Sequence, residues 1–196
     1  MANFSVNRKI GVYAQSNYGK TWLIRELIKY YASNGVPVVV YDTDHMDLKY
    51  KFSAIKNCIV FQPAVGKEDD PQYLNKFLNV LKSKYSNFMV FIDDLDSFFD
   101  SNSALSFEFE ALKSAASKGR HQRMGLIYAS KMAAYIPTQL VQNTNLFYIG
   151  SFPTAKSIKS IDKIVSFDDI KKLDYQQHEF IEIDCEQNFA KRLVKA

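Results

Sequence analysis

Short, continuously apolar runs alternate with longer amphipathic segments along most of the chain. The runs are predicted strands, at residues 9–14, 37–41, 58–62, 88–92, 124–129 and 146–149. Helices are expected between them, at residues 21–32, 70–84 and 104–117. Runs that are apolar at every position are typical of parallel strands that helices cover on both faces. The pattern therefore predicts an α/β fold with three layers and a mostly parallel central sheet.

The last part of the chain has a different pattern. From about residue 161 to residue 196, charged side chains are more frequent, and the stretch Glu179–Asp184 (EFIEID) alternates polar with apolar positions. Such alternation is typical of a strand with one solvated face, so we expect a half-exposed edge strand there. No repeat or linker divides the sequence. We expect one domain over residues 1–196 with a more charged C-terminal extension.

A phosphate-binding turn is predicted between the first strand and the first helix. The residues that match the P-loop pattern are Ala14, Gln15, Ser16, Asn17, Tyr18, Gly19, Lys20 and Thr21. Backbone N–H groups of such a turn surround the phosphates, and the following helix N-terminus adds partial positive charge. We expect Lys20 to reach the β- and γ-phosphates and the Thr21 hydroxyl to bind Mg²⁺. The predicted cofactors are therefore ATP and Mg²⁺.

Two positions of this turn carry a steric requirement. Gly19 is needed because the backbone must approach the phosphates without a Cβ atom in the way. Ala14 stands where the pattern has its first glycine, and its methyl group fits only if its φ angle is negative. The chain has no Asn-Lys-x-Asp motif, the pattern that specifies guanine. We therefore favour ATP over GTP.

A carboxylate at the end of a nearby strand is the second requirement of a Mg²⁺-nucleotide site, and two candidates compete. Asp42 follows the strand PVVVY, and the pair Asp93 and Asp94 follows the strand FMVFI. A kinase or GTPase arrangement favours Asp42, which lies nearer to the turn in sequence. An arrangement with an additional strand and a doubled acid favours the pair. There, Asp93 would bind the metal and Asp94 would act as general base for the attacking water.

Three segments together resemble the FtsK–HerA superfamily of P-loop motors, and within it the genome-packaging ATPases of turreted icosahedral archaeal viruses. The segment AQSNYGKT resembles the Walker A motif, and FMVFIDDLDSF, from Phe88, resembles Walker B. The third segment, GRHQRMGLIYASKMAAYIP, covers Gly119–Pro137. As in the superfamily, basic residues precede an apolar strand, and polar residues follow the strand's end before a proline. The three lie within residues 9–149. The resemblance implies a RecA- or FtsK–HerA-like fold.

The resemblance also implies a function and its partners. Such motors act as rings, here a hexamer or pentamer, with ATP bound between subunits and DNA in the central channel. The implied activity is ATP-driven translocation of double-stranded DNA into a preformed capsid. A capsid or portal-vertex protein would be a further partner. The implied location is the host cytoplasm, with the protein also at a virion vertex.

Further catalytic candidates lie in the third segment. The superfamily commonly has a γ-phosphate-sensing glutamine at the strand end, where this chain has Ser130 followed by Lys131. A serine hydroxyl can bind a phosphate oxygen with less reach, and Lys131 could share the task. Arg120 and Arg123 lie in a short basic segment before the strand. Either could act as an arginine finger on the ATP of a neighbouring subunit, and solvated loop residues or DNA phosphate contacts are the alternative.

Composition narrows the classes of function only slightly. The chain has 196 residues, 47% hydrophobic and 23% charged, with a formal net charge of +4, which suits a globular protein and is compatible with a polyanionic partner. The lysines that could face DNA in a central channel are Lys156, Lys159 and Lys163.

Two distant cysteines indicate a reducing, cytoplasmic setting, and no apolar run predicts membrane insertion. A small-molecule kinase and an ATP-dependent assembly or secretion switch remain alternative functions.

Overall fold

The computed structural model describes residues 6–43, 52–99, 109–187 and 190–196, without the side chains of residues 118–122. Its strands form one sheet. They are β1 (Lys9–Tyr13), β2 (Val38–Tyr41), β3 (Cys58–Phe61), β4 (Phe88–Ile92), β5 (Met124–Ser130), β6 (Leu146–Ile149), β7 (Glu179–Asp184) and β8 (Ala190–Lys195). The order across the sheet is β3–β2–β4–β5–β1–β6–β7–β8. Strands β1 to β6 run parallel to one another, whereas β7 is antiparallel to both of its neighbours, β6 and β8.

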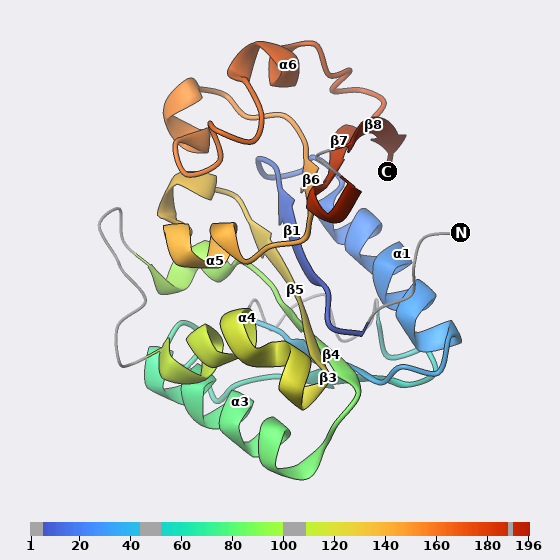
Figure 1. The fold of residues 1–196 in the computed structure, drawn as a ribbon, viewed down its shortest axis with the longest axis vertical. Coiled ribbons are helices and arrows are strands. Elements are labelled where there is room, and N and C mark those ends of the chain that lie inside the picture. Colours follow the sequence, from blue (N-terminus) through green and yellow to red (C-terminus); the bar gives the residue numbers. More distant parts are fainter. Residues whose placement is uncertain (1–5, 44–51, 100–108, 188–189) are drawn as a thin grey trace.

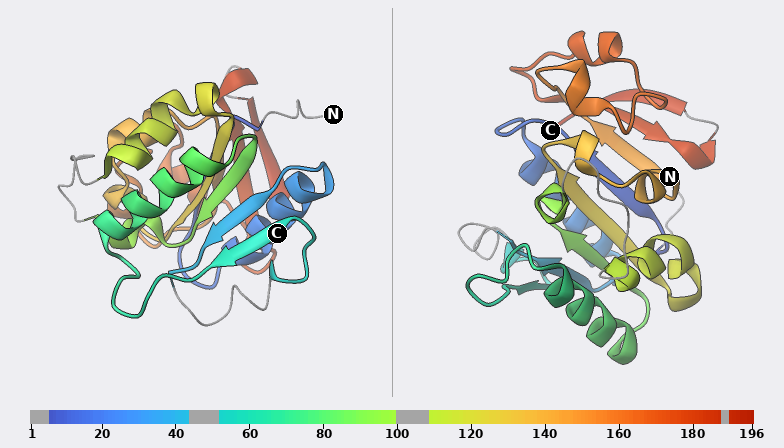
Figure 2. Two further views of the ribbon diagram at one scale, coloured as in Figure 1. Left: turned by 90° about the horizontal axis from the view of Figure 1, so that it is seen from below. Right: turned by 90° about the vertical axis from the view of Figure 1, so that its left-hand side faces the viewer.

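Helices cover both faces of the parallel part of the sheet (Figure 1 and Figure 2). The α-helices are α1 (Lys20–Ser33), α3 (Pro71–Lys84), α4 (Glu110–Gln122), α5 (Thr138–Gln142) and α6 (Phe167–Lys171). The short 3₁₀ helices are η1 (Leu95–Phe98), η3 (Ala133–Tyr135), η4 (Ala155–Ile158) and η5 (Cys185–Gln187). Helix α1 packs on one face of the sheet, and α3 and α4 pack on the other. The predicted three-layer α/β fold is confirmed.

The core consists of two apolar clusters, one on each side of the sheet. Successive residues of a strand point to opposite faces, so Val38 and Val40 join the cluster under α1, whereas Val39 and Tyr41 join the cluster under α3 and α4. Strand β4 is buried at every position. This burial on both faces explains why the inner parallel strands are apolar throughout, whereas β3, at the edge of the sheet, is only partly buried.

Local sequence signals set the bounds of the predicted helices. Helix α3 begins after Asp70, whose carboxylate accepts hydrogen bonds from the N–H groups of Gln72 (2.9 Å) and Tyr73 (3.2 Å), which makes Asp70 an N-cap. Helix α1 ends at a turn formed by Asn34 and Gly35, where Gly35 has a φ angle of 79°. Such a positive φ favours glycine.

Two predicted elements differ from the structure. Helix α4 covers Glu110–Gln122, whereas the expected helix covers residues 104–117, of which 104–108 lie outside the described residues. The predicted basic segment is therefore mostly the last part of α4. Strand β7 is not a half-exposed edge strand, because β8 pairs with it and five of its six residues are buried.

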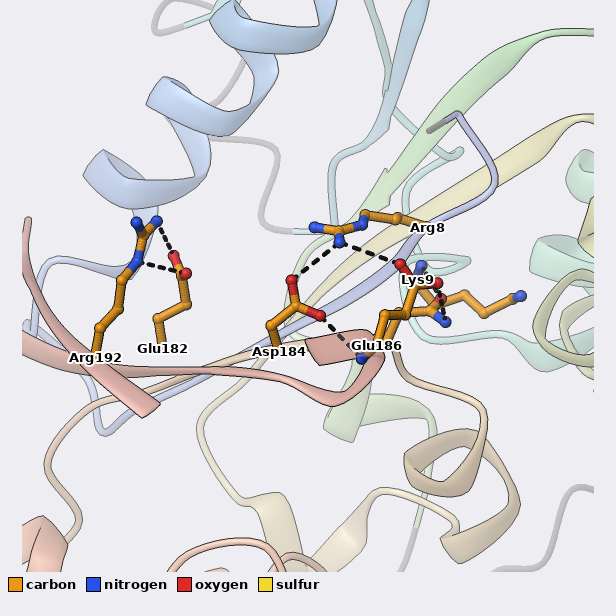
Figure 3. Close-up of polar contacts among 7 residues, drawn as sticks. Arg8, Lys9, Glu182, Asp184, Glu186 and Arg192 are labelled. Carbon is orange, nitrogen blue, oxygen red and sulfur yellow. Dashed lines mark hydrogen bonds and ion pairs between the residues drawn. The ribbon is translucent and has the colours of Figure 1, made fainter. Parts of the chain in front are cut away.

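Ion pairs explain why the charges of β7 are buried. A guanidinium N–H of Arg8 donates to Asp184 (3.0 Å) and to Glu186 (3.1 Å), and Arg192 of β8 binds Glu182 at 2.6 Å and 2.8 Å (Figure 3). Arginine thus takes the place of water on the polar face of β7.

Among the described residues, no helix is both long enough and apolar enough to cross a membrane.

Candidate functional site

The predicted phosphate-binding turn links the carboxyl end of β1 to the first residue of α1. Two backbone hydrogen bonds hold its start against neighbouring segments. The N–H of Ala14 donates to the carbonyl of Ser130 (3.2 Å), and the N–H of Gln15 donates to the carbonyl of Ser151 (3.0 Å). Ala14 is not among the described residues with a positive φ. Its methyl group therefore meets the steric condition that the sequence sets for this position.

The N-terminus of α1 is open toward the turn. Gly19 is the N-cap residue, with a φ of 87° in the left-handed region, and none of the described side chains caps the helix. The first helical turn has no acidic residue. Its N–H groups and the partial positive charge of the helix end are therefore available to an anion. This is the geometry that a phosphate-binding turn requires.

Lys20 is folded back over the turn. Its ammonium donates to the carbonyls of Ala14 (2.7 Å) and Gln15 (2.9 Å), and the residue is buried. Burial lowers the pKa of Lys20, while the charges of Asp94 and Asp93 act in the opposite direction. The structure thus places this cation between the turn and the acidic pair.

The side chain of Tyr18 anchors the turn on its other side. The ring is fully buried, and its hydroxyl donates to the backbone carbonyl of Glu179 in β7 (2.7 Å). It makes edge-to-face contacts with Tyr175 and Phe180. Gly150 leaves room for the ring, because a Cβ atom there would lie 2.5 Å from it. The motif includes Tyr18 only by its position in the turn, and nothing in the motif signals its contact with β7.

The acidic pair follows β4 directly. Asp93 is partly buried, and this burial, followed by the charge of Asp94, raises the pKa of Asp93 to about 7. The N–H of Asp94 donates to the carboxylate of Asp93 (3.0 Å). Asp94 itself has a φ of 40° in the left-handed region, which aspartate tolerates better than most residues. The bend turns the second carboxylate toward the phosphate-binding turn.

The turn and the acidic pair share one cavity of about 290 Å³. The residues that line it are Ser16, Asn17, Gly19, Lys20, Thr21, Asp93, Asp94 and Lys131. Asp42 is not one of them: it follows β2, beyond β4 in the sheet, and its carboxylate accepts from the amide of Gln62 (3.0 Å). The structure therefore brings Asp93 and Asp94, and not Asp42, to the predicted phosphate site.

Strand β5 lies between β1 and β4, and its polar end faces the same region. Ser130 is buried, and its hydroxyl accepts from the N–H of Met132 (3.1 Å). Ser130 does not line the cavity, whereas Lys131 does, with its ammonium 2.5 Å from the carboxylate of Asp94. Asp96 accepts from the N–H groups of Lys131 (3.0 Å) and Met132 (3.1 Å). Asp96 is not among the predicted site residues, although a third acid soon after the acidic pair signals it.

The remaining basic candidates lie away from the cavity. Arg123 is exposed and precedes β5, whose opposite end carries Ser130. A strand of seven residues is roughly 20 Å long, so Arg123 is distant from the phosphate-binding turn of its own subunit. Arg120 lies in the last turns of α4, and its side chain is outside the description. Three further lysines, Lys156, Lys159 and Lys163, lie in and after η4, and all three are exposed.

Solved structures with the same fold include ATP-binding NTPases. The genome-packaging NTPase B204 of Sulfolobus turreted icosahedral virus 2, in complex with ATP-γ-S, matches with a TM-score of 0.80, 16% sequence identity and 98% coverage of both chains. The pCW3 conjugation coupling protein TcpA, with ATP-γ-S, has a TM-score of 0.67, 16% identity, and coverage of 97% of this chain and 61% of its own.

A more distant match is the cytoplasmic domain of EssC, with a TM-score of 0.59, 18% identity, and coverage of 81% of this chain and 34% of the other. No known protein family's sequence profile matches the chain, and no curated protein is similar to it in sequence. The likeness is thus one of structure, and with the first two proteins it extends over nearly the whole chain. The strand order, the phosphate-binding turn and these neighbours together show that the chain has the three-layer P-loop NTPase fold of these solved structures.

Proposed function

We propose that this chain is a Mg²⁺-dependent ATPase that moves double-stranded DNA, in the manner of a viral genome-packaging motor. The observation that carries the ATPase part is the position of β5 between β1 and β4. This order favours the arrangement with an additional strand and a doubled acid over the kinase arrangement. It also sets Lys20, Thr21 and the acidic pair around one cavity.

The side chains around the cavity fit a magnesium ion bound with a nucleotide. Thr21 and Asp93 supply a hydroxyl and a carboxylate, the oxygen ligands that Mg²⁺ prefers. The pKa of Asp93 is about 7 because burial disfavours its charged form, and a nearby cation would offset that cost. When bound, the ion would neutralise charge on the phosphates. The open end of α1 and Lys20 would hold the phosphate oxygens.

Asp94 is the proposed general base for hydrolysis. A water molecule next to the γ-phosphate would lose a proton to the Asp94 carboxylate while its oxygen forms a bond to phosphorus. The bond from phosphorus to the β–γ bridging oxygen breaks, and ADP leaves with that electron pair. Lys20 would stabilise the negative charge that develops on the transferred group. Ser130 is the sensor candidate at the end of β5, and because it does not line the cavity, it would have to move to reach the γ-phosphate.

The second part of the proposal is that ATP hydrolysis drives translocation of DNA. The neighbour that matches over 98% of both chains is a genome-packaging NTPase, and another is a conjugation coupling protein. The net charge of +4 is compatible with a polyanionic partner. By this analogy the chain would assemble into a hexameric or pentameric ring, with Lys156, Lys159 and Lys163 as candidate DNA contacts. A capsid or portal-vertex protein would receive the motor, in the host cytoplasm or at a virion vertex.

An arginine finger would complete such a ring. Arg123 is distant from its own phosphate-binding turn, so it could act only on the ATP of a neighbouring subunit. Arg120 is the second candidate. A mixture of two inactive variants, Lys20→Ala and an arginine variant, would recover activity in mixed rings if the finger acts in trans. Absence of recovery in rings of verified mixed composition would contradict this assignment.

ATP hydrolysis measured with and without double-stranded DNA tests the function as a whole. We expect Mg²⁺-dependent hydrolysis that DNA stimulates. Hydrolysis that instead requires a small metabolite would indicate a kinase, and nucleotide binding with negligible turnover would indicate a switch. The Lys20→Ala variant is the control for contaminating ATPases, because loss of the lysine should abolish turnover of the folded protein.

A further inference from the structure

Lys131 and Asp94 form a close ion pair inside the cavity. The ammonium of Lys131 lies 2.5 Å from Oδ2 of Asp94, and the side chains are 47% and 20% exposed. Charge-assisted hydrogen bonds of this kind are stronger than neutral ones. The pair occupies a lone pair of the carboxylate proposed as general base. In this arrangement Asp94 has less capacity to accept a hydrogen bond from water.

The backbone at Lys131 is held by two hydrogen bonds to Asp96, whereas its side chain is held by the ion pair with Asp94. The carboxylate of Asp96 accepts from the N–H groups of Lys131 and Met132, at 3.0 Å and 3.1 Å. Asp96 is itself buried. The four-carbon stem of the lysine extends from this fixed point into the cavity and is about half exposed. Its ammonium can therefore change partners while the strand end remains in place.

A nucleoside triphosphate would compete with Asp94 for this ammonium. Lys131 lines the same cavity as Lys20 and Thr21, where a γ-phosphate would lie if the proposed ATP site is right. A terminal phosphate carries more negative charge than one carboxylate and offers three oxygens. A diphosphate in the same site would end before this point. The two nucleotides would therefore differ in their effect on the ion pair.

We propose that Lys131 is a further catalytic residue, which binds Asp94 until a γ-phosphate takes over its ammonium and leaves Asp94 to activate water. This inference rests on the proposed ATPase function and assigns the γ-phosphate contact to Lys131. The exchange couples recognition of the triphosphate to release of the base. It also restrains Asp94 while the product diphosphate is bound.

Binding of two nucleotides gives the first test. Calorimetry would measure the affinity of wild-type protein and of Lys131→Met for Mg²⁺ with ADP and with the non-hydrolysable analogue AMPPCP. We expect the variant to bind AMPPCP about tenfold more weakly and ADP within about twofold of wild type, since one charge-assisted contact is lost only with the triphosphate. Lys131→Arg, which keeps the charge, should retain most of the difference. An equal loss for both nucleotides would indicate a structural role and overturn the inference.

A second comparison removes the charge of Asp94. In Asp94→Asn protein, Lys131→Met should still weaken AMPPCP binding, because the γ-phosphate contact is lost there too. If the effect disappears in that background, Lys131 acts only by neutralising Asp94, and the exchange is wrong. The turnover number at saturating ATP adds a third outcome. Lys131→Met should lower it, whereas a lysine that stayed on Asp94 would make the variant faster than wild type.

Failure of this inference is distinguishable from failure of the proposed function. The Lys20→Ala variant should lose affinity for both nucleotides, and thermal unfolding should show that each variant is folded. If wild-type protein binds neither nucleotide, the ATPase proposal is wrong and the inference falls with it. If wild-type protein and Lys20→Ala behave as expected but Lys131→Met does not distinguish AMPPCP from ADP, only the role of Lys131 is wrong.

Discussion

Replacement of Asp93 by asparagine should stabilise the protein in the absence of metal and nucleotide. The pKa of Asp93 is raised to about 7, first by burial and then by the charge of Asp94. Above that pH the folded protein must hold an ionised carboxylate that the unfolded chain would expose to water. Asparagine has almost the same shape, and its carbonyl oxygen can still accept the N–H of Asp94, now 3.0 Å from the carboxylate. The substitution therefore removes the charge and retains the contact.

The size of the effect follows from the two pKa values. Between the ordinary carboxyl value of 3.8 and the folded value of about 7, the folded state holds the proton and the unfolded state does not. Wild-type stability therefore falls as the pH rises through this window and levels off above about 7. At about 1.4 kcal/mol per pH unit, the difference approaches about 4 kcal/mol at pH 8. For a chain of this size that is a rise in Tm of roughly 8–16 °C.

Urea unfolding of both proteins in EDTA, from pH 4 to pH 8, measures the difference. The gain for Asp93→Asn should be small near pH 4 and should grow up to about pH 7. Asp70→Asn is a control of opposite sign, since the Lys67 ammonium and the backbone at the start of α3 lower the pKa of Asp70; its loss of stability should fade as the pH falls. A gain for Asp93→Asn that is the same at every pH would show that the raised pKa of Asp93 is not its cause.

Three further substitutions test the geometry of the site. Lys20→Ala should leave the Tm within a few degrees of wild type and abolish ATP turnover, which a coupled phosphate-release assay measures. Gly150→Ala places a Cβ atom 2.5 Å from the Tyr18 ring, so ATP affinity and Tm should both fall; an unchanged affinity would show that the turn tolerates the shift. Asp96→Asn leaves one carbonyl oxygen for the two N–H groups at the end of β5, including that of Lys131, and should cost about 1–3 kcal/mol in urea unfolding. Wild-type stability of Asp96→Asn would show that these two bonds contribute little.

The sequence predicts the parallel part of the fold well, for a physical reason. Runs such as Val38–Tyr41 and Phe88–Ile92 are buried on both faces, so every position in them must be apolar. Such an unbroken apolar run is easy to recognise in the sequence. The antiparallel part is harder to predict. The carboxylates of Glu182 and Asp184 look solvated because they alternate with apolar residues, but Arg192 and Arg8 cover them. Arg8 is far from β7 in sequence, and local pattern cannot reveal such a partner.

The candidate site also has a part that the sequence predicts and a part that it does not. The phosphate-binding turn and the acidic pair are short contiguous motifs, so their residue types and spacing predict their place in the cavity. The sheet order that separates Asp93 from Asp42 is a property of the whole fold, and sequence leaves both open. The roles of Tyr18 and Asp96 depend on contacts with β7 and with the end of β5. Those contacts join distant segments and leave no pattern within either segment.

The contact of Tyr18 with β7 has a mechanical consequence. The ring joins the phosphate-binding turn to the C-terminal strands through its bond to the carbonyl of Glu179 and its contact with Phe180. Displacement of the exposed strand β8 would be transmitted through β7 and this aromatic contact to the phosphate-binding turn. The position of the C-terminal strands and the shape of the phosphate-binding turn are therefore mechanically coupled, although the two segments lie far apart in the sequence.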